Sequence, residues 1–287
     1  MHHLEKFLRC FILSGGIYVL LACNLEVNQN YPIPEGYDLN HPIKIILPFE
    51  LDEISGIVYY PKDTSVFAIS DETGWLYKIF PDKKTAAEKW KFGKNGDYED
   101  LQLVDSTFYI LRSNGNILSV KIYSSDSLDV KVFEFPEKGK NEFESLYFDK
   151  TSGQLNLICK NCKEDNKNTV SVWSFNPAAQ SYAPASFVID AEKIAKQMNE
   201  KKMKFRPSAA TINPLTNELF ILSSVNKALV ITDKNGIFKK VYPLNPAIYK
   251  QPEGITFTSS GDLLISNESD KEGSPDIMVI KLKQKAR

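Results

Sequence analysis

The sequence predicts an all-β fold, a β-propeller of five blades. A short motif recurs along the chain in steps of 44, 45, 64 and 45 residues, and a second apolar run follows each copy. A period in the mid-forties with several short strands per repeat is typical of propeller blades. A further strand pattern, Ile43–Phe49, precedes the first repeat, while the last repeat lacks its final strand. Together these patterns predict a closed ring of blades.

The repeated motif opens the first strand of each blade. Its copies read SGIVY, EDLQL, ESLYF, SAATI and EGITF, and they begin at Ser55, Glu99, Glu144, Ser208 and Glu253. Turn residues separate the strands that follow each copy. We expect the N-terminal strand to supply the outer strand of the last blade and to close the ring. The alternative is a six-bladed ring with a degenerate blade in the 64-residue step.

That long step contains a pattern typical of a helix. Asp190 is a residue type that caps helices, and Ala191–Lys204 follows it, with Ile194 and Met198 one turn apart on the same face. An inserted helix against the propeller rim explains the extra length, which favours five blades over six.

The N-terminus has the pattern of a lipoprotein signal peptide. Lys6 and Arg9 precede an apolar run that is short for a bilayer span, and the run ends in Leu20-Leu21-Ala22-Cys23. This ending resembles a bacterial lipobox, which implies cleavage before Cys23 and attachment of lipid to its sulfur and its new amino group. The alternative is an ordinary secretory signal that happens to contain a cysteine.

These features predict three segments: a signal peptide at 1–22, a polar, proline-containing tether at 23–42, and the propeller domain at 43–287. We expect a lipid-anchored protein on a membrane of the bacterial cell envelope. The residues after Cys23 are not the short acidic run of surface-exported lipoproteins, which favours a periplasm-facing position. The choice between inner and outer membrane stays open.

Composition excludes several functions. The formal net charge is −1, so the chain has no basic excess to neutralise a nucleic-acid backbone. Its histidines are His2, His3 and His41, which lie outside the predicted blades, and it contains no G-x-S-x-G motif. A histidine-dependent triad or a zinc-dependent deaminase or protease is therefore excluded.

Three motif carboxylates are candidate metal ligands. Glu99, Glu144 and Glu253 occupy equivalent positions and are expected to converge near one end of the axis, where they repel one another unless a cation or protons neutralise them. Calcium accepts an irregular set of oxygen ligands, whereas magnesium demands a stricter octahedron. The alternative is structural: the carboxylates cap backbone amides or pair with Arg112, Lys160 or Arg206. Asp52 and Glu53, just before the first motif, are also within reach of this end.

Residues that end the second strands are candidates for ligand binding at the same end. Arg112 and Lys160 are expected at one equivalent position in neighbouring blades, where they would bind an anionic ligand or pair with the carboxylates. The other candidates are Asp71, Asn267 and Glu268. Cys159 and Cys162 nearby are expected as a structural disulfide or as two free thiols.

The chain resembles the SdiA-regulated proteins, bacterial propellers distantly related to NHL-repeat proteins. The resemblance runs from about Leu51 to Ile280, and it is carried by ELDEISGIVYYP, GDYEDLQLVDSTFYILRSNG, FRPSAATINPLTNELFILSS and QPEGITFTSSGDLLISNE. It implies a five-bladed propeller with a calcium site and implies no established activity. Related six-bladed folds include metal-dependent hydrolases, which is an analogy of fold alone.

Two classes of function fit the sequence. The first is a module that binds a small molecule or a protein at a calcium-stiffened mouth. The second is a calcium-dependent hydrolase of esters, lactones or phosphoesters, with a carboxylate such as Glu253 as the base. The absence of a histidine in the blades favours binding.

Overall fold

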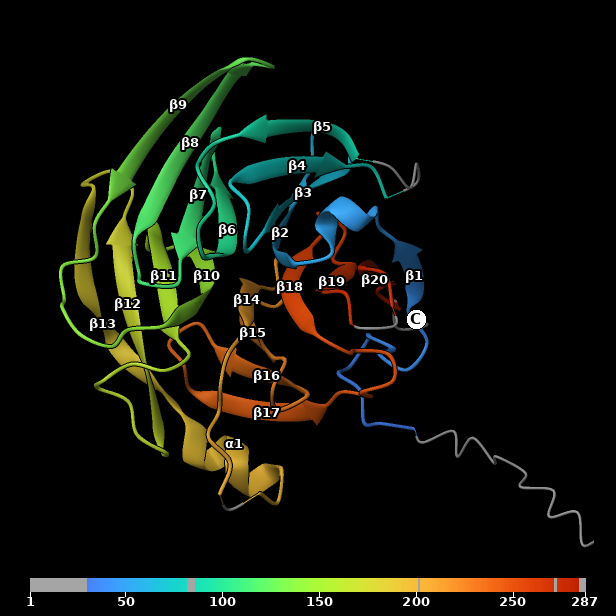
Figure 1. Cartoon of the computed structure of the whole chain (residues 1–287). Helices are drawn as coiled ribbons and strands as arrows, with labels where there is room; N and C mark the ends of the chain where they lie inside the picture. The colour runs from blue at the N-terminus through green and yellow to red at the C-terminus, as the bar shows by residue number, and fades with distance from the viewer. Residues whose placement is uncertain (1–29, 82–85, 201, 271–272, 284–287) are drawn as a thin grey trace, which may run out of the picture.

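The computed structural model describes residues 30–81, 86–200, 202–270 and 273–283. In this part of the chain, twenty strands form five antiparallel sheets of four strands each, arranged around one axis (Figure 1). The innermost strands of successive sheets pack against one another in a closed ring. The prediction of a five-bladed propeller is confirmed, and no sixth sheet is present among the described residues.

Each blade runs outward from the axis. Blade 1 contains β2 (Ile54–Tyr60), β3 (Ser65–Ser70), β4 (Trp75–Ile79) and β5 (Ala86–Lys91). Blade 2 contains β6 (Tyr98–Val104), β7 (Thr107–Arg112), β8 (Ile117–Ser124) and β9 (Ser127–Phe133). Blade 3 contains β10 (Phe143–Asp149), β11 (Gln154–Cys159), β12 (Thr169–Asn176) and β13 (Ser181–Asp190).

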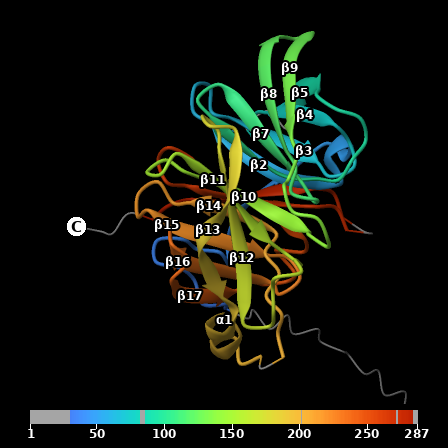
Figure 2. The same ribbon diagram turned by 90° about the vertical axis from the view of Figure 1, so that its left-hand side faces the viewer.

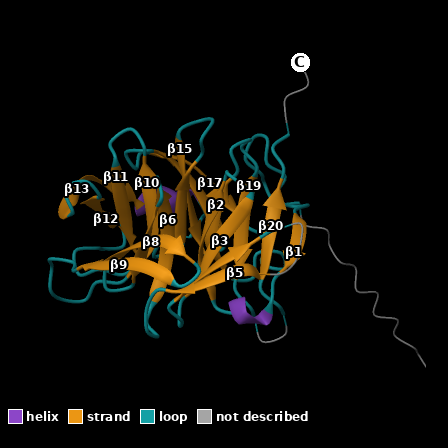
Figure 3. Ribbon diagram, turned by 90° about the horizontal axis from the view of Figure 1, so that it is seen from above, coloured by secondary structure: helices purple, strands orange, loops and turns teal. Residues whose placement is uncertain are grey.

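The last two blades follow the same order. Blade 4 contains β14 (Ala209–Ile212), β15 (Glu218–Ser223), β16 (Ala228–Asp233) and β17 (Phe238–Pro243). Blade 5 contains β18 (Pro252–Phe257), β19 (Leu263–Asn267), β20 (Asp276–Ile280) and, outermost, β1 (Ile43–Ile46). We call the end of the ring where the innermost strands begin the mouth; Figure 3 views the ring from the side.

The N-terminal strand closes the ring as expected. β1 pairs antiparallel with β20, with Ile43 opposite Val279 and Ile46 opposite Asp276. The strand is shorter than expected, because Pro48, which has no N–H to donate, starts a turn of 3-10 helix, η1 (Phe49–Leu51). This pairing covers the edge of β20, which would otherwise be open to other chains.

Apolar side chains fill the wedges between neighbouring blades. Burial is deepest in the inner strands: every residue of β3, from Ser65 to Ser70, is buried. Each fully buried Leu, Ile, Val or Phe contributes about 1.5–3 kcal/mol relative to its exposed state. The packing holds the five mouth-side loops in fixed relative positions, which is what a site built from several blades requires.

The inserted helix is present but shorter than expected. α1 (Ala191–Gln197) is capped by the side chain of Asp190, which accepts a hydrogen bond from the Lys193 N–H at 3.0 Å. The predicted end at Lys204 is wrong because Asn199 takes a left-handed backbone conformation, with φ of 58°, and the chain then turns to bury Phe205. No described helix has the length and apolar character of a membrane span.

The expected tether at 23–42 needs correction at its C-terminal end. Tyr37 and Leu39 are 4% and 3% exposed and pack in the core between blades 4 and 5. The Tyr37 hydroxyl donates to the Gly261 carbonyl at 2.9 Å, and the Tyr249 hydroxyl donates to the Leu39 carbonyl at 2.9 Å. This part of the segment therefore belongs to the propeller. The predicted signal peptide and the lipidation residue Cys23 lie outside the described residues.

Candidate functional site at the mouth of the propeller

A β-bulge sets the direction of each motif carboxylate. In blade 2, Tyr98 pairs with Arg112 and Asp100 pairs with Leu111, which leaves Glu99 as the extra residue. The register shifts in the same way around Glu144 in blade 3 and Glu253 in blade 5. A bulge bends a strand locally and re-aims the side chain of the unpaired residue. Each glutamate thus leaves the ladder at the mouth end of its innermost strand.

The motif serines join neighbouring blades instead. The Ser55 hydroxyl of blade 1 donates to the Tyr98 carbonyl of blade 2 at 2.8 Å. The Ser208 hydroxyl of blade 4 donates to the Pro252 carbonyl of blade 5 at 2.7 Å. Both acceptors directly precede a bulged glutamate. The two residue types in the repeat therefore have different roles. The serines form hydrogen bonds between neighbouring blades, and the glutamates place carboxylates at the mouth.

Asp100 fills the axis directly beyond the mouth glutamates. Its carboxylate accepts hydrogen bonds from the N–H groups of Leu101 at 2.8 Å and Leu146 at 2.7 Å, and from that of Ala210 in blade 4. Burial raises the pKa of Asp100, and these three N–H donors lower it. Gly56 makes room: a Cβ there would lie 2.7 Å from the Cα and an Oδ atom of Asp100. Asp100 therefore links the innermost strands of blades 2, 3 and 4.

Three carboxylates converge on one side of the mouth. Oxygen atoms of Glu53, Asp71 and Glu268 lie within 4.8 Å of one another. Main-chain bonds fix their positions: the Glu268 N–H donates to the Gln251 carbonyl at 2.9 Å, and the Ser269 N–H donates to the Asp52 carbonyl at 2.7 Å. We call Glu53, Asp71 and Glu268 the acidic trio.

The acidic trio is held in an environment that disfavours negative charge. Burial, a hydrogen bond with Glu53 and neighbouring charges raise the pKa of Glu268 to about 9. Burial and the charges of Glu53 and Glu72 raise the pKa of Asp71 to about 6. Among the described residues, Asp71 Oδ1 is buried with no hydrogen-bond partner. A bound cation would stabilise carboxylates that repel one another, one of which has a buried oxygen without a partner among the described residues.

Two of the predicted metal ligands lie beside the trio. Burial and a hydrogen bond with Asp97 raise the pKa of Glu99 to about 9. Burial also raises the pKa of Glu253, while a hydrogen bond with Ser224 and the positive charge of Lys160 act to lower it. The charge of Glu253 acts on both Glu99 and Glu268, so the carboxylates form one continuous network.

The third predicted ligand, Glu144, has a different partner. Its carboxylate forms an ion pair and hydrogen bond with Lys160 Nζ, which also lies 3.8 Å from an oxygen of Glu142. Among the described residues, Glu99, Glu144 and Glu253 do not form a group of three with oxygens as close as those of the acidic trio. The structural alternative for Glu144, an ion pair with a neighbouring cation, is thus observed.

Arg112 and Lys160 are not at equivalent positions. Arg112 lies opposite Tyr98, whereas Cys159 lies opposite Phe143, so Lys160 is one residue further along its strand than expected. The Arg112 guanidinium lies 5.6 Å from the Tyr98 ring centroid, and its Nε is buried with no hydrogen-bond partner among the described residues. Contact with the ring of Tyr98, on the neighbouring strand of the same blade, thus holds Arg112 in place.

Asn267 supports the mouth from behind. It is 2% exposed, and its amide donates to Asp276 at 2.8 Å and to the Ile248 carbonyl at 3.2 Å. Both donor contacts hold the chain around β19. Because Asn267 directly precedes Glu268, these bonds also fix the position of Glu268. The Asn267 side chain itself is buried in the protein.

A disulfide joins Cys159 and Cys162, whose Cα atoms are 5.9 Å apart. The sequence left open a structural disulfide or two free thiols, and the structure contains the disulfide. The bridge constrains the turn that carries Lys160 and Asn161, and both of their N–H groups bond to the Glu142 carbonyl. The disulfide therefore helps to place the cation that neutralises Glu144.

Two residues at the mouth were not assigned a role from the sequence. Glu53 belongs to the acidic trio, and its only sequence signal was proximity to the first motif. Lys227, in the turn between β15 and β16, is half-buried. Burial lowers its pKa, and the negative charge of Glu253 offsets part of that effect. The sequence did not mark Lys227 as functional, because the corresponding turns of the other blades have different residues.

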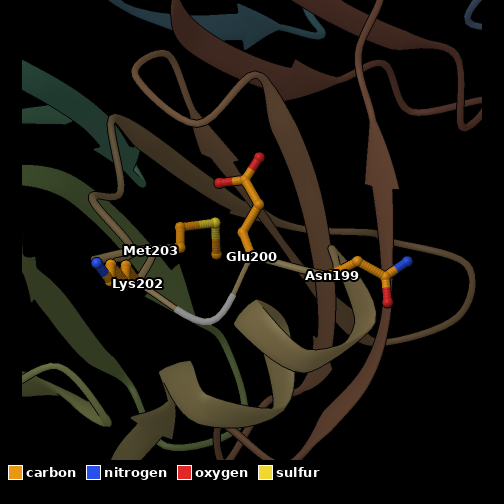
Figure 4. A pocket seen from close by; sticks show the side chains of 4 residues that line it. All are labelled: Asn199, Glu200, Lys202 and Met203. Atoms are coloured by element: carbon orange, nitrogen blue, oxygen red, sulfur yellow. The ribbon is translucent and has the colours of Figure 1, made fainter.

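A separate pocket lies away from the mouth, on the loop after α1. Its volume is about 500 Å³, and it is lined by Asn199, Glu200, Lys202 and Met203. In Figure 4 these side chains point in different directions rather than toward a common centre. The pocket therefore shows no arrangement for chemistry.

Comparisons with solved structures support the propeller fold. Glutaminyl cyclase from Myxococcus xanthus aligns with a TM-score of 0.58 at 12% identity, covering 85% of this chain and 97% of that one. Regucalcin from Agrobacterium tumefaciens strain C58, described as a calcium-binding protein, aligns with a TM-score of 0.51 at 12% identity, covering 86% and 95%. At such identities the likeness establishes the fold alone.

Sequence comparison gives the family. The search of curated proteins found no match to this chain. A family model does match, over residues 34–271, which include all of the mouth residues described above. The chain belongs to the SdiA-regulated family.

Proposed function

We propose that the protein binds a calcium ion at the mouth of its propeller and acts as a ligand- or partner-binding module on the bacterial cell envelope. One observation carries the proposal: the acidic trio, Glu53, Asp71 and Glu268, converges from two blades on rigid main-chain supports. The trio replaces the three motif glutamates as the main set of proposed ligands, and Glu99 and Glu253 lie next to it.

The donor set fits calcium. All three groups offer carboxylate oxygens, the ligand atoms that hard cations prefer, and one of those oxygens, Asp71 Oδ1, is buried without a partner in the part of the chain that the structure describes. Zinc would favour histidine or thiolate ligands. The described sulfurs at the mouth are joined to each other in the disulfide of Cys159 and Cys162. The calcium-binding regucalcin propeller gives this proposal a precedent in fold.

The ion would supply positive charge where carboxylates crowd. It would offset most of the negative charge of the trio and join the loop before β2, the turn after β3 and the loop after β19. Arg112 and Lys160, on blades 2 and 3, offer further positive charge near the same end. The mouth would then present both signs of charge to a soluble ligand.

The envelope location rests on the sequence. Leu20-Leu21-Ala22-Cys23 has the composition of a lipobox, and acyl chains on Cys23 would hold the protein to a membrane. We expect the full-length protein to partition with membranes and Cys23→Ala to prevent labelling by a fatty acid. Labelling of the variant at the wild-type level would contradict the lipidation proposal.

Calcium binding is testable by titration calorimetry on protein stripped with a chelator. Wild type is expected to bind one ion, with a rise in melting temperature, and Asp71→Asn is expected to weaken binding at least about tenfold. The control is Asp126→Asn, which removes an exposed carboxylate in the β8–β9 turn of blade 2, outside the trio. Equal affinity of Asp71→Asn and wild type would contradict the site.

A hydrolase remains the second candidate, because burial raises the pKa of the Glu253 carboxyl and so makes the ionised carboxylate a stronger base than an exposed glutamate. A panel of lactones, esters and phosphoesters, assayed with calcium and with chelator, separates the two functions. Calcium-dependent turnover that Glu253→Gln abolishes would support the hydrolase. Calcium-dependent stabilisation without turnover would leave the binding module.

A further inference from the structure

A second pocket lies at the end of the ring opposite the mouth, between blades 2 and 3. It has a volume of about 210 Å³, and we call it the hairpin pocket. It is lined by Thr107, Tyr109, Ser119, Lys121, Tyr123, Asp129, Lys131, Phe133 and Gln180. The first eight come from β7, β8 and β9, and Gln180 comes from the turn between β12 and β13.

The long β8–β9 hairpin creates this pocket. β8 has eight residues and β9 has seven, and the hairpin projects beyond the rest of the propeller (Figure 2). Strand register places side chains in rows on one face: Tyr109, Ser119 and Lys131 lie opposite one another in neighbouring strands. In a regular blade such a face packs against the next sheet, but here its outer part stays open.

The base of the pocket is fixed by contacts between the two blades. The Phe133 ring lies 5.0 Å from that of Phe175 in blade 3, and the Tyr109 ring lies 6.2 Å from the same phenylalanine. The Tyr182 hydroxyl of blade 3 donates to the carbonyls of Gly115 and Phe133, each at 3.0 Å. The base of the pocket is thus supported by contacts between the blades, whereas its outer lining, Lys121, Tyr123, Asp129, Lys131 and Gln180, is exposed.

The polar groups that line the pocket have no polar partners. Among the described residues, no side-chain hydrogen bond or ion pair involves any of its eight polar side chains. Lys121 and Asp129 are directly opposite in the ladder, yet Lys121 Nζ lies over the Tyr123 ring, 5.5 Å from its centroid. Elsewhere on the surface comparable lysines do pair, such as Lys281 with Asp262 at 2.9 Å. The hydroxyl, amide and ammonium groups that line the pocket are thus available to bind a ligand.

The chemistry of the lining defines a ligand. Two lysines and one aspartate give a net positive charge, and two tyrosines, Ser119, Thr107 and Gln180 supply hydroxyl and amide groups. Tyr123 is 61% exposed, and its ring offers a flat apolar face. The volume is below the roughly 300–1,000 Å³ of sites for drug-sized ligands, so it admits a single ring.

We propose that the hairpin pocket binds an acidic sugar, a hydroxylated ring that carries a carboxylate or a phosphate. Lys121 and Lys131 bind the anionic group, Tyr123 contacts the ring, and the hydroxyl and amide side chains bind the ring hydroxyls. This proposal stands apart from the calcium site, because the pocket lies at the opposite end of the axis and contains none of the acidic trio.

Saturation-transfer NMR with full-length protein tests the proposal, using glucuronate, glucose 6-phosphate and glucose as observed ligands and inorganic phosphate, which has no carbon-bound protons, as a competitor of the acidic sugars. At least one acidic sugar is expected to bind with a Kd of about 1 mM, and glucose and phosphate at least about tenfold more weakly. The tighter of the two acidic sugars identifies the anionic group. Binding of inorganic phosphate as strong as that of both sugars, or no binding of either sugar, would overturn the proposal.

Variants locate the binding. The double variant Lys121→Gln/Lys131→Gln is expected to weaken acidic-sugar binding at least about tenfold. Lys240→Gln is the matched control, since Lys240 lies over Tyr242 at 6.0 Å on the outer strand of blade 4. Binding is expected to survive the chelator and Glu268→Gln. Unchanged binding by the double variant, or equal loss in the control, would contradict this site.

Discussion

The main-chain N–H of Asp71 donates a hydrogen bond to the carbonyl oxygen of Glu53 at 3.0 Å. This bond joins the loop that enters β2 to the turn that leaves β3, and it brings two carboxylates together at the start of blade 1. Glu268 reaches the same point from blade 5. Because the backbone holds all three, their repulsion cannot be relieved by moving apart. A cation or protons must relieve it.

The two sets of carboxylates at the mouth can be separated by matched variants. We expect Glu268→Gln to weaken calcium binding at least about tenfold, since it removes a charged ligand of the acidic trio. Glu144→Gln is expected to leave the affinity within about threefold of wild type, because Lys160 already neutralises that carboxylate. Titration calorimetry of both variants checks this. A larger loss in Glu144→Gln would favour the motif glutamates as ligands.

Calcium affinity is expected to rise with pH. Without the ion, Glu268 has a pKa of about 9 and Asp71 a pKa of about 6, so calcium must displace protons from both carboxyl groups. Affinity should increase between about pH 6 and pH 9, and proton release should accompany binding. Calorimetry in buffers with different ionisation enthalpies measures that release. An affinity that does not change over this range would contradict the assignment.

The stability of the metal-free protein is expected to change in the opposite direction. Glu99 and Glu268 hold protons in the folded protein that the unfolded chain releases, because their folded pKa values are about 9 and their ordinary value is 4.5. Their contribution is present at low pH and is lost as pH rises toward 9. Urea unfolding in chelator should show this fall, and calcium should reduce it. A metal-free protein that gains stability over the same range would contradict it.

Asp100 is expected to contribute to the stability of the ring. Asp100→Asn replaces an acceptor of N–H groups from three strands by an amide, one end of which is itself a donor. We expect a loss of about 1–3 kcal/mol in the free energy of unfolding. Urea denaturation measures it, with Asp126→Asn in the exposed β8–β9 turn as control. A loss in the control equal to that in Asp100→Asn would remove the special role of Asp100.

The disulfide is expected to stabilise the mouth on blade 3. Replacing Cys159 and Cys162 by serine removes a short cross-link and should lower the free energy of unfolding by about 2 kcal/mol. It should also loosen the turn that places Lys160. Denaturation of the double variant, compared with wild type, gives the loss. Identical midpoints under non-reducing conditions would show that the turn is held by its hydrogen bonds alone.

The sequence was sufficient for the ring but not for the site. Blade count and closure by β1 follow from strand patterns and from one missing strand, both of which are visible in the alignment of repeats. The helix end was placed too late because Asn199 leaves the helical conformation inside a run of good helix formers. Tyr37 and Leu39 were missed because single apolar residues between prolines give no periodicity.

The bulges explain why the mouth was harder to predict. Repeat alignment identifies Glu99, Glu144 and Glu253 as equivalent residues near the start of the innermost strands, but which side chains meet depends on register shifts of single residues. Glu53 lies before the repeat and Glu268 after a second strand, so no shared motif links them. Only the contact of blade 5 with blade 1, made when the ring closes, brings these carboxylates together.

Crystals of the protein grown at saturating calcium, with anomalous data collected to identify the ion, show directly whether the acidic trio binds calcium. We expect one calcium ion at the mouth, with oxygen ligands from Glu53, Asp71 and Glu268. A mouth without an ion, or an ion bound by Glu99, Glu144 and Glu253 instead, would contradict the account.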